Sequence, residues 1–211
     1  MLIVHHLNNS RSQRILWMLE ELGLDYEIRR YRRNSDMSAP KELKAIHPLG
    51  KSPILEDISA EGERTAVVET GAICDYLVER ANGRLGPDDA SDRILYRQFL
   101  HYAEGSVMPV LLAMLVASKI PIMGRAAIKR VQPMLDTHLD FVESQLASRQ
   151  WFAGERITAA DIMMSFPLEA ARARGGLGRA RPATTAWLDR IHTRPAYIAA
   201  LEKGGPYAFA T

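Results

Sequence analysis

The sequence contains a single cysteine, Cys74, among 211 residues. A lone thiol excludes an intramolecular disulfide framework, a Cys-x-x-Cys redox pair and a cysteine-rich zinc site. The six histidines show no spacing of the His-Glu-x-x-His kind, so we expect no metal site. We therefore expect a protein of a reducing compartment, the cytoplasm, in which Cys74 contributes only to packing.

The sequence also lacks an excess of one charge and a long uninterrupted apolar run. Lys and Arg total 27 against 25 Asp and Glu, a formal net charge of +2, which provides no strong field for nucleic acid. The basic cluster Arg29 to Arg33 alternates along an expected strand, and we interpret it as a solvated edge. The longest apolar run, residues 107–117, contains Pro109 and is too short to span a bilayer, and the first residues do not resemble a secretory signal. We expect neither nucleic acid nor a membrane as a partner.

The first 80 residues have the pattern of an α/β layer. Segments with apolar residues at spacings of three and four, typical of helices, alternate with short apolar or period-two segments, typical of strands. Turn residues separate these segments. The expected order is β-α-β, then α, then β-β-α, over residues 2–7, 12–22, 24–31, 34–46, 53–55, 65–68 and 70–80.

No strand signals follow this layer. Residues 82–89 are rich in turn formers and are expected to be a linker. Long helical patterns cover 90–118, which we expect to bend or break at Pro109, and 124–147, and three shorter helices follow. The sequence therefore predicts an α/β domain over 1–81 and an all-helical domain over 90–211.

Two motifs make the organisation more specific. Gly50-Lys51-Ser52-Pro53-Ile54-Leu55 is followed, 16 residues after the proline, by Glu69-Thr70-Gly71-Ala72-Ile73, and the helical part contains Ile157-Thr158-Ala159-Ala160-Asp161-Ile162. Together they resemble the cytosolic glutathione transferases over essentially the whole chain, and residues 6–17 are similar to a bacterial and fungal subgroup of serine type. The resemblance implies a thioredoxin-like first domain. The motif at 157–162 is a capping box with a hydrophobic staple, to which we assign a role in folding only.

The resemblance also implies a site for glutathione. A proline that opens a strand can hold a bend that exposes the backbone before it. The resemblance implies that Pro53 is cis and that Ser52 pairs with the cysteinyl backbone as a short added strand. Thr70 is placed to cap the following helix, whose N-terminus suits a carboxylate, while Glu69 suits an ammonium. The resemblance implies that these two residues hold the γ-glutamyl end. The alternatives are an ordinary edge-strand proline and a simple helix cap.

Three charged residues are further candidates for contacts with glutathione. Lys51 is the candidate for the glycyl carboxylate, and Lys41 could substitute for a basic pair that some classes carry where this chain has Ser38 and Ala39. Glu104 could reach the glutamyl ammonium across a dimer interface. Each of the three could instead be a solvated surface residue.

Ser10 is the candidate catalytic residue. A thiol of pKa near 8.5 is only a few per cent thiolate at neutral pH, so the site must favour the anion. A hydroxyl at the N-terminus of the helix over 12–22 can donate a hydrogen bond to the sulfur, and the helix dipole adds to the effect. Ser12, Asn9 and Asn8 remain alternatives, as does a pure capping role for Ser10. The turn contains no cysteine, so a mixed disulfide with an enzyme thiol at this turn is excluded.

The helical domain is expected to supply the apolar acceptor pocket, with Met108 and Leu112 as candidates among residues that otherwise serve the core or a dimer contact. The expected function is addition of the glutathione thiolate to small apolar electrophiles, with hydroperoxide reduction as a further activity. Glutathione would be a cosubstrate, with no other cofactor, and the protein would be a cytoplasmic homodimer. The alternative is a non-catalytic ligand-binding or interaction protein with the same fold.

Overall fold

The computed structural model describes residues 1–174, 176–178 and 180–210, and the chain divides into two compact units. Unit 1 contains Met1–Gly86 and His192–Ala210, and unit 2 contains Pro87–Ile191. The first boundary falls inside the expected linker at 82–89. The last helix, α9 (Pro195–Gly204), which the sequence analysis grouped with the helical domain, packs in unit 1.

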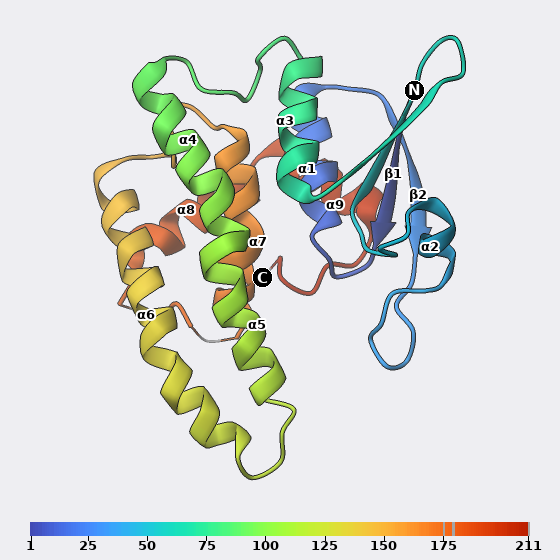
Figure 1. Ribbon diagram of the computed structural model, residues 1–211. Coiled ribbons are helices and arrows are strands. Elements are labelled where there is room, and N and C mark those ends of the chain that lie inside the picture. Colours follow the sequence, from blue (N-terminus) through green and yellow to red (C-terminus); the bar gives the residue numbers. More distant parts are fainter. Residues whose placement is uncertain (175, 179, 211) are drawn as a thin grey trace. The chain divides into compact units, whose positions relative to one another are not determined.

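Unit 1 is built on a mixed four-stranded sheet of order β2-β1-β3-β4. Figure 1 labels the neighbouring strands β1 and β2 of this sheet. β1 (Leu2–Leu7) pairs in parallel with β2 (Tyr26–Tyr31) and antiparallel with β3 (Ile54–Ile58), which continues antiparallel to β4 (Arg64–Val68). The expected hairpin and the β-α-β opening are both present. This arrangement confirms the thioredoxin-like class of the first domain.

Four helices belong to unit 1. They are α1 (Ser12–Leu22), α2 (Glu42–Ile46), α3 (Thr70–Arg80) and α9. α1 lies between β1 and α9, where the buried Trp17 ring meets Tyr197 edge-on at 5.3 Å between centroids. Gly23 ends α1 in the left-handed conformation, as the sequence predicts. Burial of Trp17 and Tyr197 explains why α9 belongs to this unit, since both rings lose most of their contact with water.

Unit 2 is helical throughout its regular elements. Its helices are α4 (Ala90–Tyr102), α5 (Met108–Ala117), α6 (Gly124–Ser148), α7 (Ala159–Ala173) and α8 (Pro182–His192). A five-residue π-helical turn, η1 (Ala103–Val107), joins α4 to α5. The break expected at Pro109 is therefore a wider turn just before it. A proline lacks an N–H and its ring collides with the carbonyl four residues earlier, and a π turn accommodates both effects without ending the helix.

The continuous helix from Ala90 to Ala117 is long and apolar enough to cross a membrane by length and composition alone, and 39% of its most apolar 18-residue window is buried inside the structure. A core helix of a soluble protein meets the same criteria, so one such helix is weak grounds for a membrane span. The absence of a membrane partner remains a prediction.

The motif at 157–162 forms the expected capping box at the start of α7. The buried Asp161 carboxylate accepts hydrogen bonds from the backbone N–H of Thr158 at 2.9 Å, the backbone N–H of Phe152 at 3.0 Å and the indole of Trp187 at 3.3 Å. Burial raises the pKa of Asp161 to about 6, although these donors oppose the shift. One side chain therefore joins α7, α8 and the segment before α7.

We expect Asp161→Ala to destabilise the protein by about 3 kcal/mol or more, because three buried N–H groups lose their acceptor. Thr158→Ala keeps the backbone donor and should cost only about 1 kcal/mol. Equilibrium denaturation of the two variants measures both values. Equal losses would contradict the central role of the carboxylate.

Candidate functional site

Three chain segments that carry the predicted site residues meet at one end of the sheet. β1 ends at Leu7 close to the start of β3, since His5 pairs with Ile54, and Ile54 also pairs with Val68 at the end of β4. Because β3 runs antiparallel to both neighbours, the turn after β1, the segment before β3 and the segment after β4 emerge together. We call residues 8–12, 51–53 and 69–70 the sheet end.

The Ser52–Pro53 peptide bond is cis, as the resemblance implied. The Ser52 hydroxyl donates to the His5 carbonyl at 2.8 Å and accepts from the Leu7 N–H at 3.2 Å, which joins this segment directly to β1. Pro53 is buried and Lys51 is exposed. The expected roles of these three residues toward a ligand remain predictions.

α3 begins at the sheet end with an unusual backbone conformation. Glu69 has φ +69° and is the N-cap, and its exposed side chain makes no capping hydrogen bond. Thr70 is the first helical residue and is buried, so the expectation that it caps the helix is wrong. Since Thr70 already has helical geometry, its hydroxyl does not accept from the N–H groups two or three residues on, as that of an N-cap residue does. A bulky residue at positive φ is uncommon and often marks a functional site.

Arg33 anchors the turn between β1 and α1. Its guanidinium donates to the carbonyls of Asn8 and Asn9, each at 3.3 Å, and its backbone N–H donates to the Asn8 side chain at 3.0 Å. Burial, and then the nearby Arg11, lower the pKa of Arg33. The interpretation of this residue as part of a solvated edge is wrong, because the strand ends at Tyr31 and the half-buried Arg33 side chain bonds to the turn carbonyls.

The C-terminal segment reaches the same turn. The Ala208 N–H donates to the Asn9 side-chain oxygen at 2.8 Å, and Asn9 has φ +50°. The rings of Tyr207 and Phe209 on either side contact each other at 5.5 Å. No local pattern could have predicted this contact, which joins residues 199 positions apart.

A buried cluster of hydroxyls lies directly beneath the turn. The Ser10 and Ser12 hydroxyl oxygens are 2.7 Å apart, and Ser12 Oγ is 2.9 Å from Nδ1 of His6. Burial, and then the charge of Arg30, lower the pKa of His6 to about 4, so its ring is neutral at physiological pH. Sequence reasoning treated His6 only as a strand residue. The available signal was that His5 and His6 are neighbours in one strand. Successive side chains of a strand point to opposite faces of the sheet, so one of the two had to face α1.

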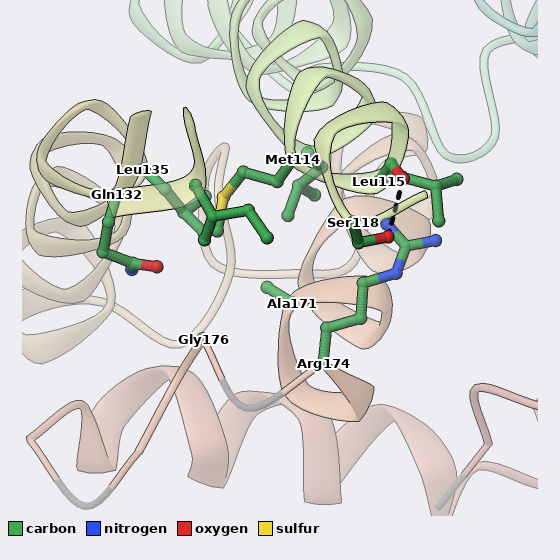
Figure 2. A pocket seen from close by; sticks show the side chains of 10 residues that line it. Met114, Leu115, Ser118, Gln132, Leu135, Ala171, Arg174 and Gly176 are labelled. Carbon is green, nitrogen blue, oxygen red and sulfur yellow. Dashed lines mark hydrogen bonds between the residues drawn. The ribbon is translucent and has the colours of Figure 1, made fainter. Parts of the chain in front are cut away.

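Unit 2 contains an apolar cavity of about 310 Å³ (Figure 2). Arg174 reaches into it from the end of α7 toward Leu115 and Ser118, and burial lowers the pKa of this arginine. The predicted pocket residues do not line it: Met108 is 7% exposed and packed away, and Leu112 is 52% exposed. The lining residues are Leu111, Met114, Leu115, Ser118, Ile128, Gln132, Leu135, Ala171, Arg174 and Gly176.

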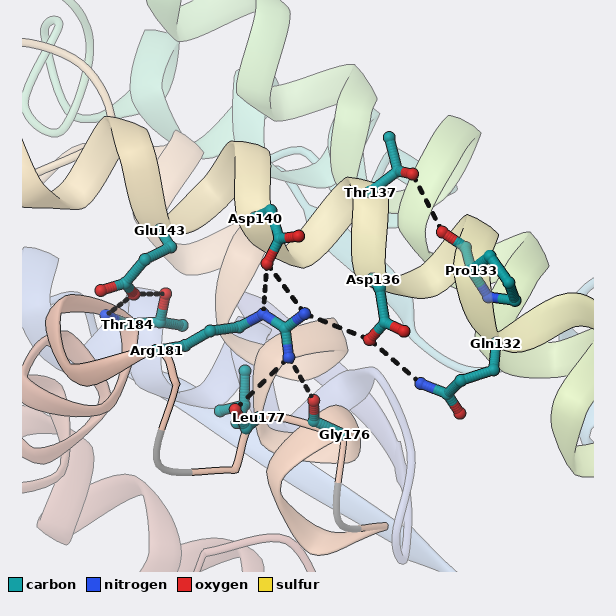
Figure 3. A network of polar contacts seen from close by, with 10 residues as sticks. All are labelled: Gln132, Pro133, Asp136, Thr137, Asp140, Glu143, Gly176, Leu177, Arg181 and Thr184. Atoms are coloured by element: carbon teal, nitrogen blue, oxygen red, sulfur yellow. Dashed lines mark hydrogen bonds and ion pairs between the residues drawn. The ribbon is translucent and has the colours of Figure 1, made fainter. Parts of the chain in front are cut away.

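One wall of the cavity is fixed by an arginine network (Figure 3). The Arg181 guanidinium donates to Asp140 at 3.0 Å and to Asp136 at 3.1 Å, both on α6, and to the Gly176 carbonyl at 2.9 Å. Asp136 also accepts from Gln132, which lines the cavity together with Gly176. The network therefore holds two lining residues in place.

The remaining candidates are scattered. Lys41 is exposed just before α2, and Glu104 is half-buried in the π turn of unit 2. Cys74 is fully buried, and burial raises the pKa of its thiol to about 12, which makes it a poor nucleophile. Within residues 1–174, 176–178 and 180–210, no group of three His, Cys, Asp or Glu side chains is placed to hold a metal ion.

Comparisons with known proteins agree with this architecture. Residues 10–80 match the family model of the glutathione S-transferase N-terminal domain, and residues 107–195 match that of the C-terminal domain. The chain is 34% identical to glutathione S-transferase 3 of Schizosaccharomyces pombe, over 96% of this chain and 88% of that protein. It is also 34% identical to glutathione S-transferase 1 of Saccharomyces cerevisiae, over 95% and 94%. A crystal structure of a glutathione S-transferase from Actinobacillus pleuropneumoniae superposes with a TM-score of 0.85 at 32% identity, covering 100% of this chain and 95% of that one.

We expect Ala208→Pro to release the C-terminal segment, because proline has no N–H to donate to Asn9. Loss of one hydrogen bond of about 1 kcal/mol should raise amide hydrogen exchange at Tyr207, Phe209 and Ala210 about fivefold. Ala208→Ser keeps the donor and serves as the control. Unchanged exchange in the proline variant would show that other contacts hold the segment.

Proposed function

Because the chain belongs to the glutathione S-transferase family, we propose that it activates the thiol of glutathione as a thiolate and adds the sulfur to small apolar electrophiles. The observation that carries this proposal is the convergence of three segments at the sheet end. A hydroxyl cluster, a cis-proline edge and a helix N-terminus emerge there from adjacent strand ends. Such a set matches the thiol, backbone and carboxylate of one tripeptide.

Each part of glutathione has a proposed partner at the sheet end. The backbone of Ser52 pairs with the cysteinyl residue, and Lys51 binds the glycyl carboxylate. The N–H groups in the first turn of α3 lack intrahelical acceptors and suit the γ-glutamyl carboxylate, with Glu69 close to its ammonium. Lys41 and Glu104 are further proposed contacts, the latter across a homodimer.

The proposed chemistry requires the sulfur to ionise. Ser10 donates a hydrogen bond to the thiolate, and the N-terminus of α1 and the Arg33 guanidinium add positive potential at the same turn. The thiol proton leaves to solvent, the sulfur forms a bond to the electrophilic carbon, and the leaving group departs with its electron pair. With a hydroperoxide, the same thiolate would attack an oxygen of the O–O bond and release the alcohol, and a second glutathione would reduce the resulting sulfenic acid to give glutathione disulfide and water. Both activities therefore depend on one anion.

The cavity of unit 2 is our candidate binding site for the apolar electrophile that accepts the sulfur. Its volume of about 310 Å³ is near the lower end of small-molecule pockets, and its methionine and leucine side chains suit varied apolar shapes. We propose a homodimer in the cytoplasm on the family resemblance alone. A non-catalytic protein would bind glutathione without turning over any electrophile.

Ser10→Ala should lower kcat/KM about 10- to 1,000-fold for a generic aryl halide, since one donor to the developing anion is removed. Retention on immobilised glutathione should persist, because binding rests on the other segments. Cys74→Ala is the control and should keep full activity. Full activity in Ser10→Ala would transfer the role to another group, and no activity in the unaltered protein would favour the non-catalytic alternative.

A second pair of variants tests the acceptor pocket. Leu115→Trp should fill part of the cavity and lower kcat/KM about fivefold or more for apolar electrophiles without weakening glutathione binding. Leu112→Trp is the control, because Leu112 is on the same helix but outside the cavity lining, and it should change kcat/KM less. A larger loss in Leu112→Trp would support the surface predicted from the sequence and argue against the cavity.

A further inference from the structure

Two hydrogen bonds next to the β1–α1 turn link Ser10 through Ser12 to His6. The two oxygen atoms are 2.7 Å apart, and Ser12 Oγ is 2.9 Å from His6 Nδ1. All three side chains are buried. The protonation of the His6 ring decides which way the two hydroxyl protons point.

The His6 ring is neutral at physiological pH, because burial lowers its pKa to about 4. A neutral imidazole has one N–H donor and one acceptor nitrogen. The backbone of Gly204 makes a hydrogen bond that favours the protonated ring, so its carbonyl accepts the ring N–H. With Nδ1 facing Ser12, the N–H directed at Gly204 is on Nε2, and Nδ1 is left as an acceptor for the Ser12 proton.

The hydrogen-bonding capacity of the Ser12 hydroxyl is then fully used. Its single proton goes to His6, and its two lone pairs accept from Ser10 and from the Leu7 N–H at 3.2 Å, a donor that Ser12 shares with the Ser52 hydroxyl. The Leu7 carbonyl, at 3.3 Å from Ser12 Oγ, is a longer alternative acceptor. Ser10 therefore donates inward to Ser12, and its oxygen also accepts from the Ser12 N–H at 3.2 Å. Ser12 has no proton left for a ligand.

We propose that His6 and Ser12 are positioning residues for Ser10, which hold its hydroxyl proton inward until an anionic glutathione sulfur draws it outward. The inference rests on the proposed function. A neutral thiol or thioether is a weak acceptor and cannot compete with the Ser12 oxygen, whereas a hydrogen bond to a charged sulfur can. Ser10 thus donates its hydrogen bond to the reactive thiolate. When the neutral thioether product is bound, Ser10 donates to Ser12 instead.

The test is the pKa of the thiol of bound glutathione, measured from the ultraviolet absorbance of the thiolate. Ser12→Ala and His6→Leu remove the inward competition and should lower this pKa by about half a unit to one unit, a three- to tenfold gain in thiolate. His6→Asn, whose amide oxygen can accept in place of Nδ1, should match the unaltered protein. In a Ser10→Ala background all of these differences should vanish.

An unchanged or raised thiol pKa in His6→Leu and Ser12→Ala would overturn the proposal, as would a difference that persists without the Ser10 hydroxyl. If Ser12→Ala does not fold, the pair His6→Leu and His6→Asn decides. Nitrogen NMR of the His6 ring in the ligand-free protein is an independent measurement: the proposal requires the Nε2–H form, and an Nδ1–H ring would overturn it. Failure of the protein to bind glutathione would overturn the proposed function. The tautomer of the His6 ring would still decide whether Ser12 and His6 hold the Ser10 proton inward.

Discussion

The position of β1 between a parallel and an antiparallel neighbour is the constraint on which the candidate site depends. Its parallel neighbour places the end of β2, and with it Arg33, beside the turn that follows β1. Its antiparallel neighbour brings the start of β3 to the same end, and the hairpin adds the end of β4. Four segments distant in sequence therefore meet wherever β1 ends. Shifting its register by one residue would also exchange His5 and His6 between the two faces of the sheet.

Burial controls the electrostatics of this site as much as charge does. His6 is kept neutral because it lies in the interior, so it acts as an acceptor rather than as a fixed positive charge. Arg33 instead supplies its charge to two turn carbonyls, and α1 adds the positive end of its dipole. The fully buried Cys74 thiol has its pKa raised by the same desolvation. The two thiols therefore differ in environment. Cys74 is buried and inert, whereas the glutathione sulfur, the proposed nucleophile, would lie at the turn with positive potential.

Local patterns were sufficient for most elements and for the motif residues. Helical periodicity from Ser12, Gly23 as a stop signal and the Thr158-to-Asp161 box each depend on neighbours within a few positions, and the structure contains all three. The hairpin and the cis bond before Pro53 followed from turn chemistry and the family resemblance. The cap of α3 was misplaced by one residue, because the positive φ of Glu69 comes from its surroundings and has no signal in its side chain.

Contacts between distant segments were beyond such reasoning. Arg33 and Ala208 hold the turn at Asn8 and Asn9 from opposite parts of the chain, and α9 joins unit 1 through Tyr197. Leu111 and Leu115 line the cavity in unit 2, whereas Met108 and Leu112 do not, and the expected contact of these two residues with an acceptor stays a prediction. Periodicity cannot assign a face to a helix that is apolar on every side.

A crystal structure with reduced glutathione bound tests the central claim most directly. The account requires the cysteinyl backbone to pair with Ser52, the γ-glutamyl carboxylate to lie at the N-terminus of α3, and the sulfur to lie within about 3.5 Å of the Ser10 hydroxyl. Glutathione bound away from the sheet end, or a sulfur turned away from the β1–α1 turn and beyond hydrogen-bond distance of Ser10, would contradict it.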